Sequence, residues 1–216
     1  MKGDVILIED HHYRAAEAIA ERLLPRIRRH ERRYVVTVAG ESGSGKSETG
    51  AAIAEMIEKH SELRCMVLQQ DDYFVHPPRT NDATRRKDIG WVGTQEVKLE
   101  LLDEHLKSAL EGADEITKPL VIYEQDRVSE EIMSLAGVQV VVAEGTYTSL
   151  LKNVDARVFI ARNRLETLES RKKRGREAIE PFLEEVLQIE HEIIAPHREF
   201  ADIVITRDYE VEFVTL

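Results

Sequence analysis

The sequence has a single cysteine, Cys65, among 216 residues, so it cannot form an internal disulfide. Such a chain is typical of a reducing compartment, and we expect Cys65 to be a small core residue. Apolar runs of about 18 residues, the length that a membrane span requires, are also missing. The apolar stretch near the N-terminus is short and has acidic neighbours, unlike a secretory signal. We therefore expect a cytoplasmic protein that does not bind membranes.

An excess of positive charge is lacking too. The chain has 30 Lys and Arg against 41 Asp and Glu, a formal net charge of −11. Nucleic-acid polymers are bound through many cationic contacts to their phosphates, so we expect no such partner. Hydrophobic residues make up 42% and charged residues 33%, which excludes a disordered class. The length suits one domain over residues 1–216.

The chain does contain short apolar runs that are separated by helical patterns. The first is Tyr34–Ala39, with an amphipathic helix predicted before it at Tyr13–Arg33 and helix formers after it from Lys46 to Lys59. Further strands are predicted at Cys65–Leu68, Leu120–Tyr123, Val138–Ala143, Ala156–Ala161 and Asp202–Thr206. Apolar strands that alternate with helices indicate an α/β fold with a mostly parallel sheet covered by helices.

Three other segments have interpretable patterns. Thr94 is expected to cap a helix that ends at Gly112. Residues 75–93 have prolines and little periodicity, which predicts a long loop. The last segment, Tyr209–Val214, alternates apolar and polar residues, as an edge strand does. It is expected to pair with the N-terminal segment, or with a second copy in a homodimer.

The segment Gly40–Ser47, with the sequence GESGSGKS, lies between the first predicted strand and a helix. Its pattern is that of a phosphate-binding loop, in which glycines let backbone N–H groups wrap a polyphosphate at a helix N-terminus. The alternative is a Gly/Ser turn that ends in Lys-Ser by accident. The residues expected to bind the nucleotide are Gly40, Ser42, Gly43, Ser44, Gly45, Lys46 and Ser47.

Acidic residues follow two of the other predicted strands. Asp71 and Asp72 come after the run that ends in Gln69-Gln70, and Glu144 comes directly after Val138–Ala143. Carboxyl ends of parallel strands meet at one edge of a sheet, where phosphate and metal chemistry is found in α/β folds. These acids are candidates for a metal site and for orienting an acceptor hydroxyl; solvated loop acids are the alternative.

The densest basic cluster spans residues 171–178 and includes a glycine. Arginines stabilise charge on a transferring phosphoryl group, and a glycine can serve as a hinge, so this segment is predicted to be a lid. A solvated helix face is the alternative. The arginines in question are Arg171, Arg174 and Arg176.

Six short motifs together resemble the uridine kinase and phosphoribulokinase family of P-loop kinases. They occur in the family's order between about Tyr34 and Asp208. The matching segments are Val36–Gly40 with its loop, Gln70–Phe74, Pro119–Tyr123, Ala143–Thr146, Arg174–Arg176 and Phe200–Ile205. The resemblance implies a three-layer P-loop NTPase fold with a short arginine-bearing lid.

The resemblance also implies roles for individual residues. Asp71 would accept the proton of the attacking hydroxyl, and Ser47, Glu144 and Asp71 would serve Mg²⁺. Lys46 would act on the phosphates of ATP, together with the arginines of the lid. The implied activity is transfer of the γ-phosphoryl group from ATP to an alcohol on a small molecule.

The acceptor side departs from the family pattern. Uridine kinases follow the tyrosine of the third motif with an aspartate, an aromatic residue and a histidine, whereas Tyr123 is followed by Glu124, Gln125, Asp126 and Arg127. We expect the acceptor to be a sugar, a polyol, a sugar phosphate or a nucleoside, and to bind beneath the loop at residues 75–93. Candidate contacts are Tyr73, Trp91, Tyr123, Glu124 and Arg127; core packing of Trp91 and an exposed turn at 124–127 are equally compatible. A uridine or cytidine kinase and a non-catalytic nucleotide switch remain alternatives.

Overall fold

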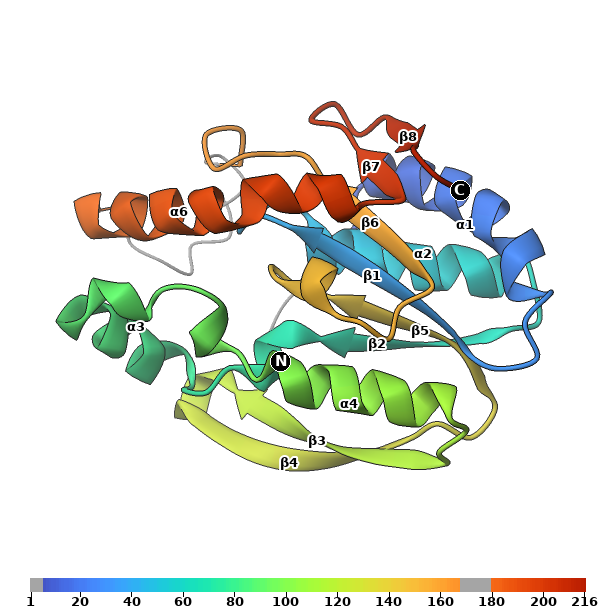
Figure 1. Cartoon of the computed structure of the whole chain (residues 1–216), viewed down its shortest axis with the longest axis horizontal. Helices are drawn as coiled ribbons and strands as arrows, with labels where there is room; N and C mark the ends of the chain where they lie inside the picture. The colour runs from blue at the N-terminus through green and yellow to red at the C-terminus, as the bar shows by residue number, and fades with distance from the viewer. Residues whose placement is uncertain (1–5, 168–179) are drawn as a thin grey trace.

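The computed structural model describes residues 6–167 and 180–216, and its centre is a six-stranded sheet between two layers of helices (Figure 1). The strand order is β2-β5-β1-β6-β7-β8, with β8 antiparallel to its neighbour and the other strands parallel. The sheet strands are β1 (Tyr34–Gly40), β2 (Arg64–Gln69), β5 (Val138–Glu144), β6 (Ala156–Ile160), β7 (Ile203–Ile205) and β8 (Val211–Phe213). The helices are α1 (Asp10–Ile27), α2 (Lys46–Lys59), α3 (Pro78–Lys87), α4 (Leu99–Leu110) and α6 (Pro181–Ile194).

The strand β1 is buried along its whole length, because helices cover both faces of the sheet. Val36 and Val38 pack into a cluster with α1 and α2. Val35 and Ala39 point to the opposite face and pack with α4 and the end of α6. Alternate side chains of one strand therefore fill two separate cores, which confirms the predicted three-layer α/β fold.

The predicted N-terminal helix is confirmed as α1, with Pro25 inside its last turn. One side of this helix is fully buried against α2, including Ile19 and Leu23. The described part of the chain has no helix that combines the length and apolar character needed to cross a bilayer.

The prediction that Leu120–Tyr123 belongs to the parallel sheet is wrong. All but Tyr123 belong to the end of β3 (Glu115–Ile122), which pairs antiparallel with β4 (Arg127–Ser134) in a separate hairpin beside α4 (Figure 1). A turn at Tyr123–Gln125 joins the strands, and Asp126 takes a left-handed conformation with φ of 46°. The strand β4 was missed because only alternate residues are partly covered, so its apolar signal is weak.

The segment predicted as a long loop, residues 75–93, contains the helix α3. It was missed because only Asn81 is buried, so α3 has no apolar stripe. Pro78 occupies its first turn, where a missing N–H costs nothing. The Asp126 carboxylate accepts hydrogen bonds from the backbone N–H groups of Arg79, at 2.7 Å, and Thr80, at 3.2 Å. A cap from the β3–β4 turn therefore holds this polar helix.

Two boundaries also differ from the prediction. Thr94 begins a short 3₁₀ turn, and α4 starts only at Leu99, because Val97 is extended and bridges to Phe74. At the C-terminus, the predicted edge strand forms as β8 but pairs with β7. The described N-terminal residues, 6–9, form no strand.

Candidate active site

The loop between β1 and α2 has the backbone that its glycines predict. Gly43 and Gly45 have φ of 75° and 94°, in the left-handed region that other residues rarely adopt. Helix α2 begins at Lys46, so its first N–H groups, which have no intrahelical partners, face this loop. Such a helix N-terminus is a binding site for anions.

Contacts from distant elements fix the loop. Lys46 Nζ donates to the Glu41 carbonyl at 2.9 Å, so the lysine folds back across the loop. The Glu41 carboxylate lies 2.6 Å from His191 Nδ1 on α6. Thr167 Oγ1 donates to the Ser42 carbonyl at 3.1 Å. The loop is thus built into the fold before any ligand arrives, which lowers the entropic cost of binding.

The adjacent acids Asp71 and Asp72 have different environments. Asp71 follows β2 and lines a cavity beside the phosphate loop. Asp72 is 3% exposed; its carboxylate pairs with Lys118 Nζ at 2.6 Å and accepts a hydrogen bond from the Val121 backbone. Asp72 therefore anchors the β3–β4 hairpin, and Asp71 is the acid available to a ligand.

Glu144 ends β5 in register with Gln69 of β2 and Val38 of β1. Its carboxyl group is buried at the edge where these strands end. Burial, and then the negative charge of Asp71, raise the pKa of Glu144 to about 7, although Lys46 and a hydrogen bond with Ser47 oppose that shift. Glu144, with its raised pKa, and the neighbouring Asp71 carboxylate make a site that a divalent cation would stabilise.

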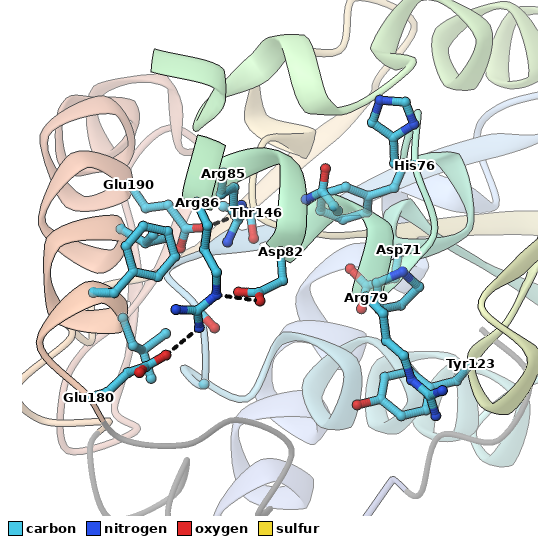
Figure 2. A pocket seen from close by; sticks show the side chains of 18 of the residues that line it. Asp71, His76, Arg79, Asp82, Arg85, Arg86, Tyr123, Thr146, Glu180 and Glu190 are labelled. Atoms are coloured by element: carbon cyan, nitrogen blue, oxygen red, sulfur yellow. Dashed lines mark hydrogen bonds and ion pairs between the residues drawn. The ribbon is translucent and has the colours of Figure 1, made fainter. Parts of the chain in front are cut away.

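A cavity of about 430 Å³ opens beside the loop, between α3 and α6 (Figure 2). This volume is in the range of small-molecule sites. The loop and strand ends contribute Ser42, Gly43, Lys46, Ser47, Asp71, Tyr123 and Thr146. The segment leading into α3 and α3 itself contribute Phe74, His76, Pro78, Arg79, Asn81, Asp82, Arg85 and Arg86. The opposite wall consists of Glu180, Phe182, Leu183, Val186 and Glu190.

Two arginines of the cavity are paired with carboxylates from both walls. Arg85 binds Glu96 at 2.9 Å and Glu190 at 3.0 Å. Arg86 lies between Asp82, at 2.8 Å, and Glu180, as Figure 2 shows. These ion pairs connect α3 to Glu180 and α6 across the cavity.

Of the predicted acceptor residues, Tyr123 alone lines the cavity. Tyr73 is fully buried in the core, where its hydroxyl group lies 2.8 Å from His105 Nδ1. Trp91 supports the wall from behind, donating from its indole N–H to Asn81 at 2.9 Å. Glu124 and Arg127 are exposed on the β3–β4 turn. The predicted lid arginines, Arg171, Arg174 and Arg176, lie outside the described residues.

Residues 75–93 were predicted to form the acceptor side, but as a loop; the helix α3 within them and the wall on α6 were not predicted. The sequence could have indicated the α6 wall. Phe182, Val186 and Glu190 are spaced four residues apart and so share one helix face. That face could have been recognised as the lining of a site.

The residues at the strand edge fit a magnesium nucleotide. Lys46 and the α2 N-terminus offer positive charge to phosphates, and the glycines allow close approach. The Ser47 hydroxyl and the carboxylates of Asp71 and Glu144 are hard oxygen ligands, as Mg²⁺ prefers. Mg²⁺ is commonly held by one or two carboxylates together with substrate phosphates, so this small set suffices.

Comparisons with known proteins agree with this geometry. The family model described as "Phosphoribulokinase / Uridine kinase family" matches residues 35–212. A bifunctional alpha-galactosidase/sucrose kinase from Mediterraneibacter gnavus is 30% identical over 195 residues, which cover 84% of this chain but only 21% of that protein. A uridine kinase from Bacillus cereus is 28% identical over 183 residues, covering 79% of this chain and 84% of the relative.

Solved structures have the same fold. A possible uridine kinase from Bacillus stearothermophilus superposes with a TM-score of 0.65 at 18% identity, covering 88% of this chain and 97% of that one. The family match extends from β1, ahead of the phosphate loop, to β8 and includes both strand-end acids. The chain therefore belongs to the phosphoribulokinase and uridine kinase family, and is a P-loop kinase that phosphorylates a hydroxyl group of a small molecule.

Proposed function

We propose that residues 1–216 act as one kinase domain that transfers the γ-phosphoryl group of ATP to a hydroxyl of a neutral sugar or polyol. The observation that carries this proposal is the charge balance on the acceptor side of the cavity. Arg85 and Arg86 are each bound by two carboxylates. An anionic acceptor would have to displace these partners, which costs more than binding an uncharged one.

The rest of the lining supports an uncharged acceptor. Among the described residues, three arginines and four acids line the acceptor side, so this part of the lining has no net positive charge: Arg79, Arg85 and Arg86 against Asp71, Asp82, Glu180 and Glu190. Carboxylates, guanidinium groups and the Asn81 amide supply the donors and acceptors that a ring of hydroxyls needs. Phe182 adds an apolar surface for the C–H face of a sugar.

The relatives offer two acceptors for comparison. The Mediterraneibacter gnavus protein is described as a sucrose kinase, and the Bacillus cereus relative as a uridine kinase. The turn that follows Tyr123 favours the sugar, because Glu124 and Arg127 are exposed and Asp126 caps α3. This turn therefore offers little to hold a pyrimidine.

Each residue at the strand edge has a separate task in this proposal. When bound, ATP with Mg²⁺ supplies the phosphoryl group. Lys46 and the α2 N-terminus hold the polyphosphate, while Ser47 and Glu144 hold the metal and its waters. Asp71 orients the acceptor hydroxyl and takes its proton.

An acceptor panel tests the proposal. ADP release would be measured with neutral sugars and polyols, including sucrose and fructose, with sugar phosphates, with D-glycerate, and with uridine and cytidine. We expect ADP release that depends on a neutral sugar or polyol, with little response to the charged acceptors.

The contrary outcomes are equally specific. ADP release with uridine and cytidine alone would establish a pyrimidine nucleoside kinase in place of a sugar kinase. ADP release with sugar phosphates alone would refute the charge argument. Nucleotide binding without acceptor-dependent turnover across the panel would favour a nucleotide switch.

A further inference from the structure

Two rings from opposite ends of the chain pack against the phosphate loop. His12 belongs to α1, which lies outside the residues matched by the family, and Tyr209 lies in the turn between β7 and β8. Both contact Gly45 so closely that a Cβ atom there would lie 2.3 Å from the Tyr209 hydroxyl and 2.9 Å from His12 Nε2. Neither ring lines the cavity. We refer to His12 and Tyr209 as the ring pair.

The hydrogen bonds of the ring pair form a directed chain. The Glu9 backbone N–H donates to His12 Nδ1 at 3.0 Å, so a neutral imidazole has its proton on Nε2. His12 Nε2 lies 3.2 Å from the Tyr209 hydroxyl oxygen and can donate to it. Tyr209 in turn donates its own proton to the Ser44 carbonyl at 2.8 Å. The chain therefore begins on α1 and ends on the backbone of the phosphate loop.

The last bond has a consequence for the nucleotide. A trans peptide is planar, so the Ser44 carbonyl and the Gly45 N–H point in opposite directions. When Tyr209 holds this carbonyl on its own side, the N–H of the same peptide is directed away from the ring pair. Gly45, with φ of 94°, could rotate easily without such a tether.

We propose that His12 and Tyr209 are positioning residues that fix the Ser44–Gly45 peptide so that its N–H faces the polyphosphate. This inference rests on the proposed use of ATP and goes beyond it, because it assigns a role in nucleotide binding to a helix outside the family match. The neighbouring groups agree with it. Arg162 donates to the Tyr209 hydroxyl at 3.3 Å, which fills the second lone pair of that oxygen. The His11 ring packs against the Tyr209 ring at a tilt of 58°, with centroids 4.1 Å apart.

Binding measurements with two probes test the proposal. Magnesium ATP and magnesium tripolyphosphate would be titrated into the full chain and into Tyr209→Phe. Tripolyphosphate has no base or ribose, so it reports on the loop alone. We expect Tyr209→Phe to weaken both probes by about three- to tenfold, the worth of one hydrogen bond.

A matched control is available on the same helix. Tyr13 of α1 donates its hydroxyl to Glu55 at 2.9 Å, away from the loop. Tyr13→Phe removes one hydrogen bond of α1 and should leave the affinity for both probes unchanged. A second pair of variants tests the other ring: His12→Leu should weaken both probes, and His12→Gln should restore binding because its amide can still donate to Tyr209.

The outcomes separate the possible roles of Tyr209. Unchanged affinity for both probes in folded Tyr209→Phe and His12→Leu would overturn the inference. Weaker ATP binding with unchanged tripolyphosphate binding would also overturn it, because Tyr209 would then act on the base. A wild-type chain that binds neither probe would overturn the proposed use of ATP, and this inference with it.

Discussion

Asp71 and Asp72 occupy adjacent positions in one short turn, yet one faces the cavity and the other is buried against Lys118. The residue pattern offers two equivalent acids here, and only the family resemblance assigns the catalytic role to Asp71. The structure distinguishes them through their partners, because the Asp72 carboxylate is already engaged by an ammonium group and a backbone N–H. Variants of the two residues can therefore show which acid contributes to catalysis and which contributes to the stability of the fold.

Replacing Asp71 by Asn should abolish most of the turnover while leaving the fold intact. The amide keeps the shape of the side chain but cannot take a proton from the acceptor. We expect kcat to fall by about 10²- to 10⁴-fold, the usual contribution of a general base. Acceptor-dependent ADP release measures this loss, and an unchanged melting temperature shows that folding is unaffected. Near-normal turnover in the folded variant would remove Asp71 from the mechanism.

Asp72→Asn is the matched comparison for that variant. It leaves the Lys118 ammonium buried with only Glu131, at 3.3 Å, as an ion-pair partner. Breaking a buried pair in this way commonly costs about 3 kcal/mol of unfolding free energy, which urea denaturation would measure. The folded fraction should retain its kcat. The opposite result, lost kcat with full stability, would exchange the roles of the two acids.

At the scale of single residues, the sequence predicts conformation well where the residues of a motif are contiguous. The residues of the phosphate loop are contiguous, so their pattern alone predicts the positive φ values and the helix N-terminus. Tyr73 and Trp91 could not be placed in the same way. Whether an aromatic ring faces a cavity or the core depends on contacts with other elements, here His105 on α4 for Tyr73 and Asn81 on α3 for Trp91.

Among the elements, α3 is held mainly by polar tertiary contacts. It has no apolar stripe, so the sequence shows no hydrophobic periodicity that would predict a helix there. Its stability comes from the Asp126 cap and from the ion pairs of Arg85 and Arg86. The parallel strands, by contrast, were predicted because burial on both faces makes them continuously apolar. Polar elements that form through long-range contacts are the part of this fold that sequence patterns miss.

Removal of the Asp126 cap should affect the acceptor more than the nucleotide. In Asp126→Ala, two backbone N–H groups of α3 lose their carboxylate, at a cost of about 1 kcal/mol. Because α3 forms one wall of the cavity, we expect KM for the acceptor to rise about fivefold while the affinity for ATP stays constant. Steady-state kinetics with each substrate varied in turn would measure both.

Gln125→Ala is a suitable control, since Gln125 is exposed on the same turn and makes no cap. It should leave both constants unchanged. Equal changes in the two KM values for Asp126→Ala would indicate a general disturbance, and would contradict a specific role of the cap in holding the acceptor wall.

At the scale of the whole molecule, the site depends on segments that are distant in sequence. Strand ends of β1, β2 and β5 supply the loop and acids, and α3 and α6 supply the acceptor walls (Figures 1 and 2). Helix α1 and the β7–β8 turn contact the loop through His12 and Tyr209. The free energy of unfolding should therefore depend on pH wherever a titratable group of these segments is buried at their contacts.

His12 is the group expected to make folding sensitive to acid. Burial, and then the charge of His11, lower its pKa from 6.5 to about 4, with Arg162 acting in the same direction and Glu48 and Glu9 opposing it. A proton added to Nδ1 would also face the Glu9 N–H that now donates to it. Between pH 6.5 and 4 the unfolded chain binds this proton and the folded chain does not, so the unfolding free energy falls as the pH falls.

The corresponding prediction compares His12→Gln with the wild type. We expect the wild type to lose about 1 to 3 kcal/mol more than the variant between pH 6.5 and 4, because glutamine does not titrate. Urea denaturation at half-unit pH steps measures the difference, in which the contributions of the shared carboxylates cancel. His30→Gln, at an exposed histidine, should follow the wild-type curve. If His12→Gln and the wild type lost stability in parallel, His12 would bind its proton equally well in the folded and unfolded chains, which would contradict a buried imidazole whose Nδ1 accepts a hydrogen bond from the Glu9 N–H.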